Sequence, residues 1–443
     1  MQKYRRSFFI VMLSVFSISL LPAQTFEDAL RPFWTIRGFG ASSFAVTNGS
    51  TFSRDVSSLS LNPANLATLQ RPAAYMAFQY GLFDQEGQLV PNARTSEKSE
   101  NYFRHNGFGF AYPVEVYQGS FVLGFAFAPS AQYNNVVRSE GLADFESSQY
   151  YLKSAIDEIG TLNSFKLSSA VEFRENLFLG LSVNFHRGDR RYTYEGIDSD
   201  TTDAFTYSRF IRTEVIKPEY RGANIDFGLS YHTSYLAFGL RLSTPLKLSV
   251  DEVNQIREHQ TYEGADPSSA EDLISYEYSV RYPMEFATNA ALTLHDITLA
   301  FDFTFHNWGG LKFDSNIEET IFNEDDNSIK KTTIDNRINT DIKLNLHRTT
   351  DIGVGLTLPL YKNITAKLGY RLIPRPYDNL PKNEQYNQLM GLGVEAKLQD
   401  MIILGLNYQL ATGSRKIRDS YFSTTTSQKF REQQFTISTS ILL

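Results

Sequence analysis

Histidine, cysteine and clustered acidic residues are the side chains that carry much catalysis and metal binding, and this chain offers few of them. Its seven histidines are scattered, and no HExxH, phosphate-binding loop, GxSxG or dinucleotide-binding glycine pattern occurs in a suitable context. The chain has no cysteine, which excludes thiol catalysis, Cys-ligated zinc, iron–sulfur clusters and a cysteine-linked lipid anchor. The acidic run 323–327 could bind a surface divalent cation, although a solvated loop is the commoner role. We therefore expect neither an enzyme nor a metal or cofactor site.

The composition excludes two further classes of protein. The formal net charge of −7, from 42 basic and 49 acidic residues, argues against a nucleic-acid partner, because nucleic acids attract basic surfaces. A mean hydropathy of −0.29 is too polar for a polytopic helical membrane protein. The 443 residues fit two or three globular domains or one large β architecture. With 34 Phe, 25 Tyr and 27 Gly in so polar a chain, apolar side chains must alternate with small or polar ones.

Residues 1–24 have the features of a secretory signal peptide. Lys3, Arg5 and Arg6 precede an apolar stretch over 7–21, and Ala23 supplies a small residue near a cleavage point. A membrane-spanning helix needs about 20 apolar residues, so an N-terminal anchor is the weaker alternative. We therefore expect an exported protein.

From residue 73 onward, apolar residues alternate with small or polar ones, which is the period of a β-strand. In 297–306, Ile, Leu and Phe occupy every odd position, and Thr, Ala, Asp and His occupy every even position. A soluble β-sandwich also alternates, but its polar face usually carries many Lys and Glu residues. Here the polar face is rich in Gly, Ser, Thr and Asn, as in the wet interior of a barrel whose apolar face meets lipid. The pattern favours the membrane barrel over the sandwich.

The fold class that follows is all-β: a transmembrane antiparallel β-barrel of about fourteen strands over 73–443. Short and long connections alternate, as periplasmic turns and extracellular loops do in outer-membrane barrels, which places both termini in the periplasm. Because lipid does not tolerate an open sheet edge, the last strand, which alternates through Leu443, should close the barrel. The predicted strands are 73–83, 103–113, 119–128, 162–173, 176–187, 220–232, 235–247, 278–294, 297–306, 340–358, 363–373, 386–398, 401–412 and 429–443.

Residues 25–72 do not have the pattern of strands and are rich in Ser, Ala, Asn and Gly. They are too many for a linker and too few for a domain with its own core. Either they form a periplasmic tail or they fold inside the barrel as a plug. Fourteen strands enclose a lumen that wall side chains alone cannot fill, which favours the plug.

Several short motifs, in strand order, resemble the FadL/TodX family of outer-membrane transporters of long-chain fatty acids and aromatic hydrocarbons. A Gly- and Ala-rich stretch leads to Asn62-Pro63-Ala64, and Arg71-Pro72 precedes the first strand. The other similar stretches are Tyr282-Pro283, Asn307-Trp308, Leu368-Gly369-Tyr370-Arg371, Pro374, Pro376 and Pro381. Each motif is short, but together they cover almost the whole chain.

The resemblance implies a hatch over 25–72, with Asn62, Pro63 and Ala64 as its gating element, and uptake of a hydrophobic small molecule. The molecule would leave sideways into outer-membrane lipid through a gap at a kinked third strand. Pro129 cannot donate a ladder hydrogen bond, so Ala128, Pro129 and Ser130 are the candidates for this exit. Alternatively, Pro129 simply ends the strand. The partners expected are the ligand and lipid, with a monomeric protein.

Two further sets of residues are candidates for ligand binding. The loop 188–219 is shorter than the ligand-capture loops of the family, and its aromatic residues could capture ligand: Tyr192, Tyr194, Phe205, Tyr207 and Phe210. Lys367 and Arg371 could bind a ligand carboxylate, although we expect lumenal charges, among them Lys166, Asp226 and Glu395, to pair with one another first. Two other functions stay open: a PorV-like barrel that handles secreted proteins, and a plugged structural or adhesive barrel.

Overall fold

The computed structural model of the chain describes residues 29–33, 56–87, 96–145, 148–201, 207–323, 328–378, 380–418 and 425–443. The predicted signal peptide and residues 25–28 and 34–55 of the predicted plug lie outside these residues, as do Phe205 and most of the acidic run.

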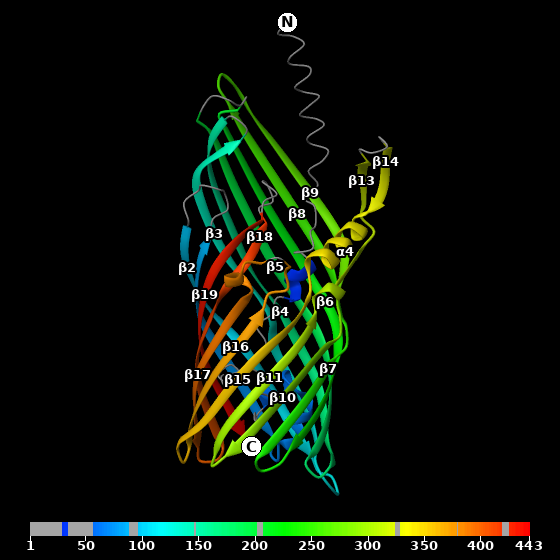
Figure 1. Cartoon of the computed structure of the whole chain (residues 1–443), viewed down its shortest axis with the longest axis vertical. Helices are drawn as coiled ribbons and strands as arrows, with labels where there is room; N and C mark the ends of the chain where they lie inside the picture. Colours follow the sequence, from blue (N-terminus) through cyan, green and yellow to red (C-terminus); the bar gives the residue numbers. More distant parts are fainter. Residues whose placement is uncertain are drawn as a thin grey trace.

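Seventeen strands form one antiparallel sheet that closes on itself (Figure 1). The last strand pairs with the first, from Ala73↔Leu442 to Glu86↔Lys429. Three wall strands consist of two successive pieces each, β7–β8, β9–β10 and β11–β12, so the wall has fourteen strands and the predicted closed barrel is confirmed. The sheet strands are β1 (Ala73–Gly87), β2 (Ser96–Val114), β3 (Phe121–Phe145), β4 (Ser148–Arg174), β5 (Leu177–Asp200), β6 (Arg209–His232), β7 (Leu236–Ser243), β8 (Leu246–Tyr262), β9 (Ala265–Tyr282), β10 (Glu285–Leu294), β11 (Ile297–Asn307), β12 (Lys312–Ser315), β15 (Arg348–Tyr361), β16 (Ile364–Pro374), β17 (Tyr386–Leu398), β18 (Ile402–Arg418) and β19 (Thr425–Leu442).

The remaining elements are short. A separate hairpin, β13–β14, and the helix α4 stand beside the upper part of the barrel (Figure 1). No helix among the described residues is both long and apolar enough to cross a bilayer. These elements are the 3-10 turns η1 (Arg31–Phe33), η3 (Val56–Ser60), η4 (Pro63–Thr68), η5 (Trp308–Gly310) and η6 (Lys382–Glu384), the helix α4 (Ile334–Asn345), and the strands β13 (Glu318–Asn323) and β14 (Ser328–Thr333).

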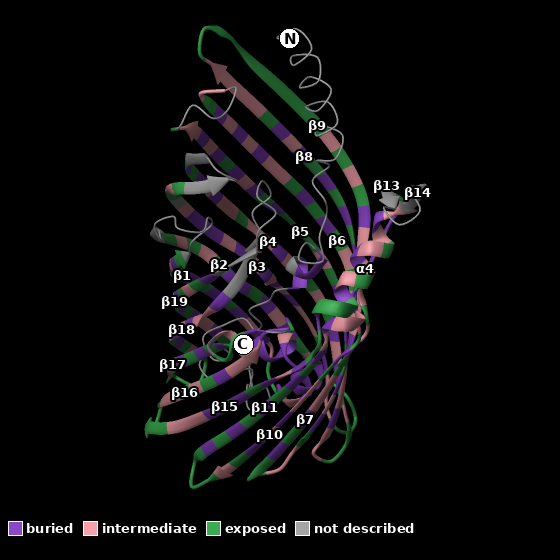
Figure 2. Ribbon diagram, turned by 45° about the horizontal axis from the view of Figure 1, so that its top comes forward, coloured by how far each residue is buried: buried purple, intermediate pink, exposed green. Residues whose placement is uncertain are grey.

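Buried and exposed residues alternate along the wall strands (Figure 2). In β5, the outward positions from Leu177 to Phe185 are apolar, and from Arg187 onward they are mostly charged or polar. A tilted strand crosses the roughly 25 Å apolar band of an outer-membrane barrel in about ten residues. The apolar run therefore marks the lipid-facing part of β5, and the rest of the strand extends beyond the bilayer.

The long loops predicted at 129–161, 188–219 and 248–277 are largely strand. They are the outer parts of the hairpins β3–β4, β5–β6 and β8–β9, which form the tall side of the barrel (Figure 1). The loop prediction was wrong because outward positions above the bilayer are polar, so the apolar alternation that signals a membrane strand stops there although the hydrogen-bonded ladder continues.

The strand predicted over 340–358 begins too early. Residues 334–345 form α4, and β15 starts only at Arg348. Ile334, Ile338 and Ile342 recur every four residues and are buried together, which is the spacing of a helix face. The predicted strand 278–294 is likewise divided between β9 and β10, because Pro283 lacks the N–H that the ladder requires.

The described parts of the N-terminal segment contact inward-facing side chains of the wall. Val56, Leu59 and Leu66 share a buried cluster with wall residues such as Val122 and Ala126. Higher up, Leu30 and Phe33 belong to a second buried cluster that includes the isoleucines of α4. Small wall residues leave the room that these segments occupy.

Closure of the sheet predicts how the protein migrates on a denaturing gel before and after heating. The detergent-extracted protein should run faster on a denaturing gel when it is left unheated than after boiling, because the closed barrel stays compact until heat breaks the ladder. An absence of this shift, together with solubility in detergent-free buffer, would contradict a transmembrane barrel.

Candidate functional site

Asn62-Pro63-Ala64 lies against the inner wall at β5, β6 and β7. The Asn62 Nδ2 donates to the backbone oxygens of Leu229 at 3.1 Å and Leu240 at 3.2 Å. Its Oδ1 accepts from the N–H of Ala64 at 3.0 Å, which caps η4. One fully buried amide therefore fixes the start of η4 and holds it to two neighbouring wall strands.

Three wall glycines make room for this segment. A Cβ on Gly180 would lie 2.3 Å from the Ala64 nitrogen, and one on Gly228 would lie 2.2 Å from Asn62 Oδ1. A Cβ on Gly239 would lie 3.1 Å from Asn62 Nδ2 and 2.4 Å from the Asn289 amide oxygen. Only glycine fits these inward positions. Their alternation with apolar residues predicts that they face the lumen, but it cannot indicate which segment they contact.

Two hydroxyl groups add to the attachment of η4. Ser230 Oγ donates to Asn65 Oδ1 at 2.8 Å, and Ser120 Oγ donates to the backbone oxygen of Ala67 at 2.7 Å. Together with Asn62, they tie η4 to wall strands β6 and β7 and to the residue that precedes β3. The polar contacts of Asn62 are thus made with β6 and β7, on strands other than the one that carries Pro129.

The predicted exit residues lie at a break in the wall. The β2–β3 ladder runs only from Phe108↔Phe127 to Val114↔Phe121. Above it, β2 continues in its pairing with β1, and β3 continues in its pairing with β4. Between the described parts of β2 and β3 above Phe127, the backbone ladder is therefore absent.

Irregularities on both strands accompany this break. On β3, the register shifts between Pro129 and Ala131, so Ser130 forms a bulge whose Oγ donates to the Leu162 oxygen at 3.0 Å. On β2, Gly107 has φ of 146°, a left-handed value that favours glycine, beside the register shift against β1. Pro129 thus stays within a longer strand and does not end it. The sequence indicated the β3 irregularity but not the matching one on β2.

Side chains span the break where the backbone does not. Arg104 of β2 donates from Nη2 to the side-chain oxygen of Asn134 on β3. The rings of His105 and Phe127 stack with centroids 5.4 Å apart. The two strands are therefore held together there by contacts that a rotamer change can release.

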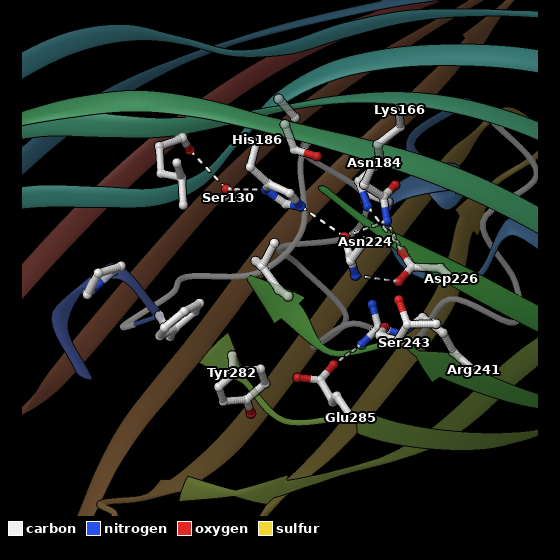
Figure 3. A pocket seen from close by; sticks show the side chains of 18 of the residues that line it. Ser130, Lys166, Asn184, His186, Asn224, Asp226, Arg241, Ser243, Tyr282 and Glu285 are labelled. Atoms are coloured by element: carbon white, nitrogen blue, oxygen red, sulfur yellow. Dashed lines mark hydrogen bonds and ion pairs between the residues drawn. The ribbon is translucent and has the colours of Figure 1, made fainter. Parts of the chain in front are cut away.

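A lumenal cavity of about 130 Å³ reaches β3 at Ala128, Pro129 and Ser130 (Figure 3). Pro32 and Phe33 of the N-terminal segment line it together with two ion pairs. Lys166 Nζ lies 3.4 Å from Asp226, and Arg241 Nη2 lies 2.5 Å from Glu285. The cavity therefore has an apolar side and a polar side.

Phe33 also lines a second cavity, again of about 130 Å³. This cavity reaches β3 at Gln132 and Asn134. Trp308 and Arg371 also line it, and Arg371 lies 2.6 Å from Asp351. Both cavities thus approach β3 at or just above the point where its pairing with β2 ends.

Two of the lumenal ion pairs are joined through a histidine. His306 lies 3.3 Å from both Glu285 and Asp351, so it links the Arg241–Glu285 pair of the first cavity to the Arg371–Asp351 pair of the second. Lys367 is 2.7 Å from Glu395 and lines neither cavity. The predicted mutual pairing of lumenal charges is confirmed for Lys166–Asp226 and Lys367–Glu395. A carboxylate-binding role for Lys367 or Arg371 stays a prediction.

Four of the predicted capture residues are described: Tyr192 and Tyr194 lie on β5, Tyr207 lies just before β6, and Phe210 lies on β6. Tyr192, Tyr194 and Phe210 are buried, and Tyr207 packs beside Phe210 with ring centroids 5.9 Å apart. They lie above the apolar outward run of β5. Burial, and then the carboxylates of Asp198 and Asp200, raise the pKa of Tyr207 to about 12, so its phenol stays protonated. Phe205 lies outside the described residues, and no contact tests ligand capture by this group.

The closed ladder, the apolar outward band and the lumenal polar network define a transmembrane β-barrel of the outer-membrane type. The model of the BamG family matches residues 38–329, well over half of the chain, and the chain belongs to that family. No curated protein matches it.

Solved structures confirm the resemblance to FadL/TodX barrels at the level of fold. A FadL homologue from Pseudomonas aeruginosa is 13% identical with a TM-score of 0.62, and the match covers 92% of this chain and 99% of that one. The P. putida toluene transporter TodX (13% identity, TM-score 0.58) and the Ralstonia pickettii toluene transporter TbuX (12%, 0.56) match with the same coverage.

The close contacts around Gly228 predict that a larger residue at this position lowers the stability of the barrel. Gly228→Ala should lower stability by about 1–3 kcal/mol, because the new methyl group overlaps Asn62 and the segment must shift. The readout is the temperature at which the fast-migrating gel band disappears.

Gly124→Ala is the matched control. Its methyl group would meet the side-chain ends of Leu59 and Leu66 at 3.1 Å, which can move, and the backbone oxygen of Phe110 at an ordinary contact distance of 3.4 Å. Equal losses in the two variants would show that Asn62 is not tightly held at the wall.

Proposed function

We propose that the chain is an outer-membrane channel for uptake of small hydrophobic molecules, which leave the lumen sideways between β2 and β3. The observation that carries this proposal is that two lumenal cavities reach β3 where its ladder with β2 ends. Two of the similar structures, TodX and TbuX, are toluene transporters, which is consistent with it. Residues 1–24 would direct export and be removed.

Lateral exit suits the chemistry of such a ligand. Moving an apolar chain from the lumen into water costs about 0.8 kcal/mol per CH₂, and passage directly into the bilayer avoids this cost. Phe127, the last β3 residue paired with β2, ends a run of outward apolar residues that begins at Phe121. A molecule leaving just above Phe127 would meet lipid at the edge of the apolar band.

We further propose that residues 25–72 act as the hatch. Within it, η4 is tied to the wall by Asn62, Asn65 and Ala67, whereas Pro32 and Phe33 line the cavities. The tied part would serve as a fixed base. Displacement of Phe33, which lines both cavities, would join them into a longer path to the β2–β3 break.

Crosslinking across the break tests this proposal. The chain has no cysteine, so Arg104→Cys with Asn134→Cys introduces the only two thiols, and a thiol-reactive linker can join them. Cells that carry the unlinked pair should take up labelled toluene or fatty acid faster than cells without the protein. Linking should reduce uptake several-fold, because β2 and β3 can no longer separate.

Tyr112→Cys with Leu123→Cys is the control pair, because these residues already face each other in the intact ladder. Linking them should leave uptake unchanged. If linking at Arg104 and Asn134 also changes nothing, lateral exit at this break is wrong. If neither probe enters cells while secreted proteins co-purify with the barrel, a protein-handling role replaces transport.

A further inference from the structure

The first cavity combines an apolar body with a polar wall of defined charge (Figure 3). Phe33, Leu162 and Leu246 line the apolar side. Opposite them are hydroxyl and amide groups, among them Ser130 and Asn224, and the two ion pairs already described. The charges in this wall determine which ligand group can enter.

The carboxylate of Asp226 contacts three neighbouring side chains of the wall. Besides Lys166 at 3.4 Å, it accepts from the side-chain amides of Asn184 at 2.8 Å and Asn224 at 3.4 Å. Its exposed fraction is only 3%. These donors come from β4, β5 and β6, so the carboxylate is held by three adjacent strands.

Glu285 neutralises the other cation of the first cavity. It lies 2.5 Å from Arg241 and 3.3 Å from His306, and it is equally buried. Two cations thus face two carboxylates, so these four residues of the described lining carry no net charge. In the second cavity, Arg371 is matched by Asp351, and Glu432 also lines the wall, so the described part of that lining has no positive excess either.

Resting on the proposed transport function, we propose that the transported molecule carries a neutral hydrogen-bonding group, such as a hydroxyl, on an apolar body, and not a free carboxylate. An ionised carboxylate would have to displace Asp226 or Glu285 from its cation or be buried without a counter-charge, and both are costly. A hydroxyl group can bond to Ser130 or Asn224 with every ion pair intact.

Three probes with the same carbon number test this proposal on the purified full chain in detergent: dodecanol, dodecanoate and dodecane. Binding is followed by tryptophan fluorescence, because Trp308 lines the second cavity and its ring packs 5.2 Å from that of Tyr282, which lines the first. At about pH 8, where the free acid is ionised, dodecanol should bind at least about tenfold more tightly than dodecanoate. It should also bind more tightly than dodecane.

Two variants test the proposal through an increase in the affinity for dodecanoate, which a misfolded protein would not show. Asp226→Asn keeps the shape of the side chain but leaves Lys166 unneutralised, so dodecanoate affinity should rise while dodecanol affinity changes little. If this variant lacks the heat-dependent gel shift, Glu285→Gln makes the same test through Arg241. Glu395→Gln, which releases Lys367 away from both cavities, should leave the preference unchanged.

The outcomes separate this inference from the transport proposal. Dodecanoate binding as tightly as dodecanol, dodecane binding as tightly as dodecanol, or an equal gain in Glu395→Gln would overturn the inference while transport stands. If none of the three probes binds, the proposed function fails and the inference falls with it.

Discussion

A backbone N–H or C=O group that faces hydrocarbon without a partner costs several kcal/mol, so a sheet can cross a bilayer only when its two edges join. This constraint explains why β19 alternates to its end and pairs with β1 over fourteen residue pairs. It also explains why the proline breaks between β7 and β8 and between β9 and β10 do not open the wall. At each, the strands on both sides stay paired: β6 continues from β7 to β8, and β10 is flanked by β7 and β11.

Closure around fourteen strands creates the second constraint, a lumen that the wall side chains cannot fill. Glycine at 180, 228 and 239 deepens the wall by removing side chains where Asn62-Pro63-Ala64 lies. The Asn62 amide then bonds to backbone oxygens of the wall, so the polar groups of an irregular segment are satisfied inside the barrel. The small wall residues thus leave room for the N-terminal segment, and the polar groups of that segment bond to the wall.

The sequence was sufficient for the strand number and the inward or outward direction of residues, because lipid imposes one apolar face on every strand. It was insufficient above the bilayer, where water on the outward face removes that signal, so the outer halves of β3 to β6 and most of β8 and β9 looked like loops. It also missed α4, whose isoleucine spacing is short and lies beside strand-like residues. The attachment of Asn62 and the β2 side of the break depend on contacts between strands far apart in sequence, which periodicity within one strand does not encode.

The position of the stretch where β2 and β3 are not paired follows from the requirement that backbone groups in hydrocarbon be hydrogen-bonded. Within the apolar run Phe121–Phe127, β3 is paired on both sides, and its pairing with β2 ends only where that run ends. Beyond this point, the side chains of Arg104 and Asn134 bond to each other across the break. A break deeper in the band would leave backbone groups in hydrocarbon, and a break far above it would release a hydrophobic ligand into water. The edge of the band is therefore the level at which a wall can open at low cost and still deliver an apolar molecule to lipid.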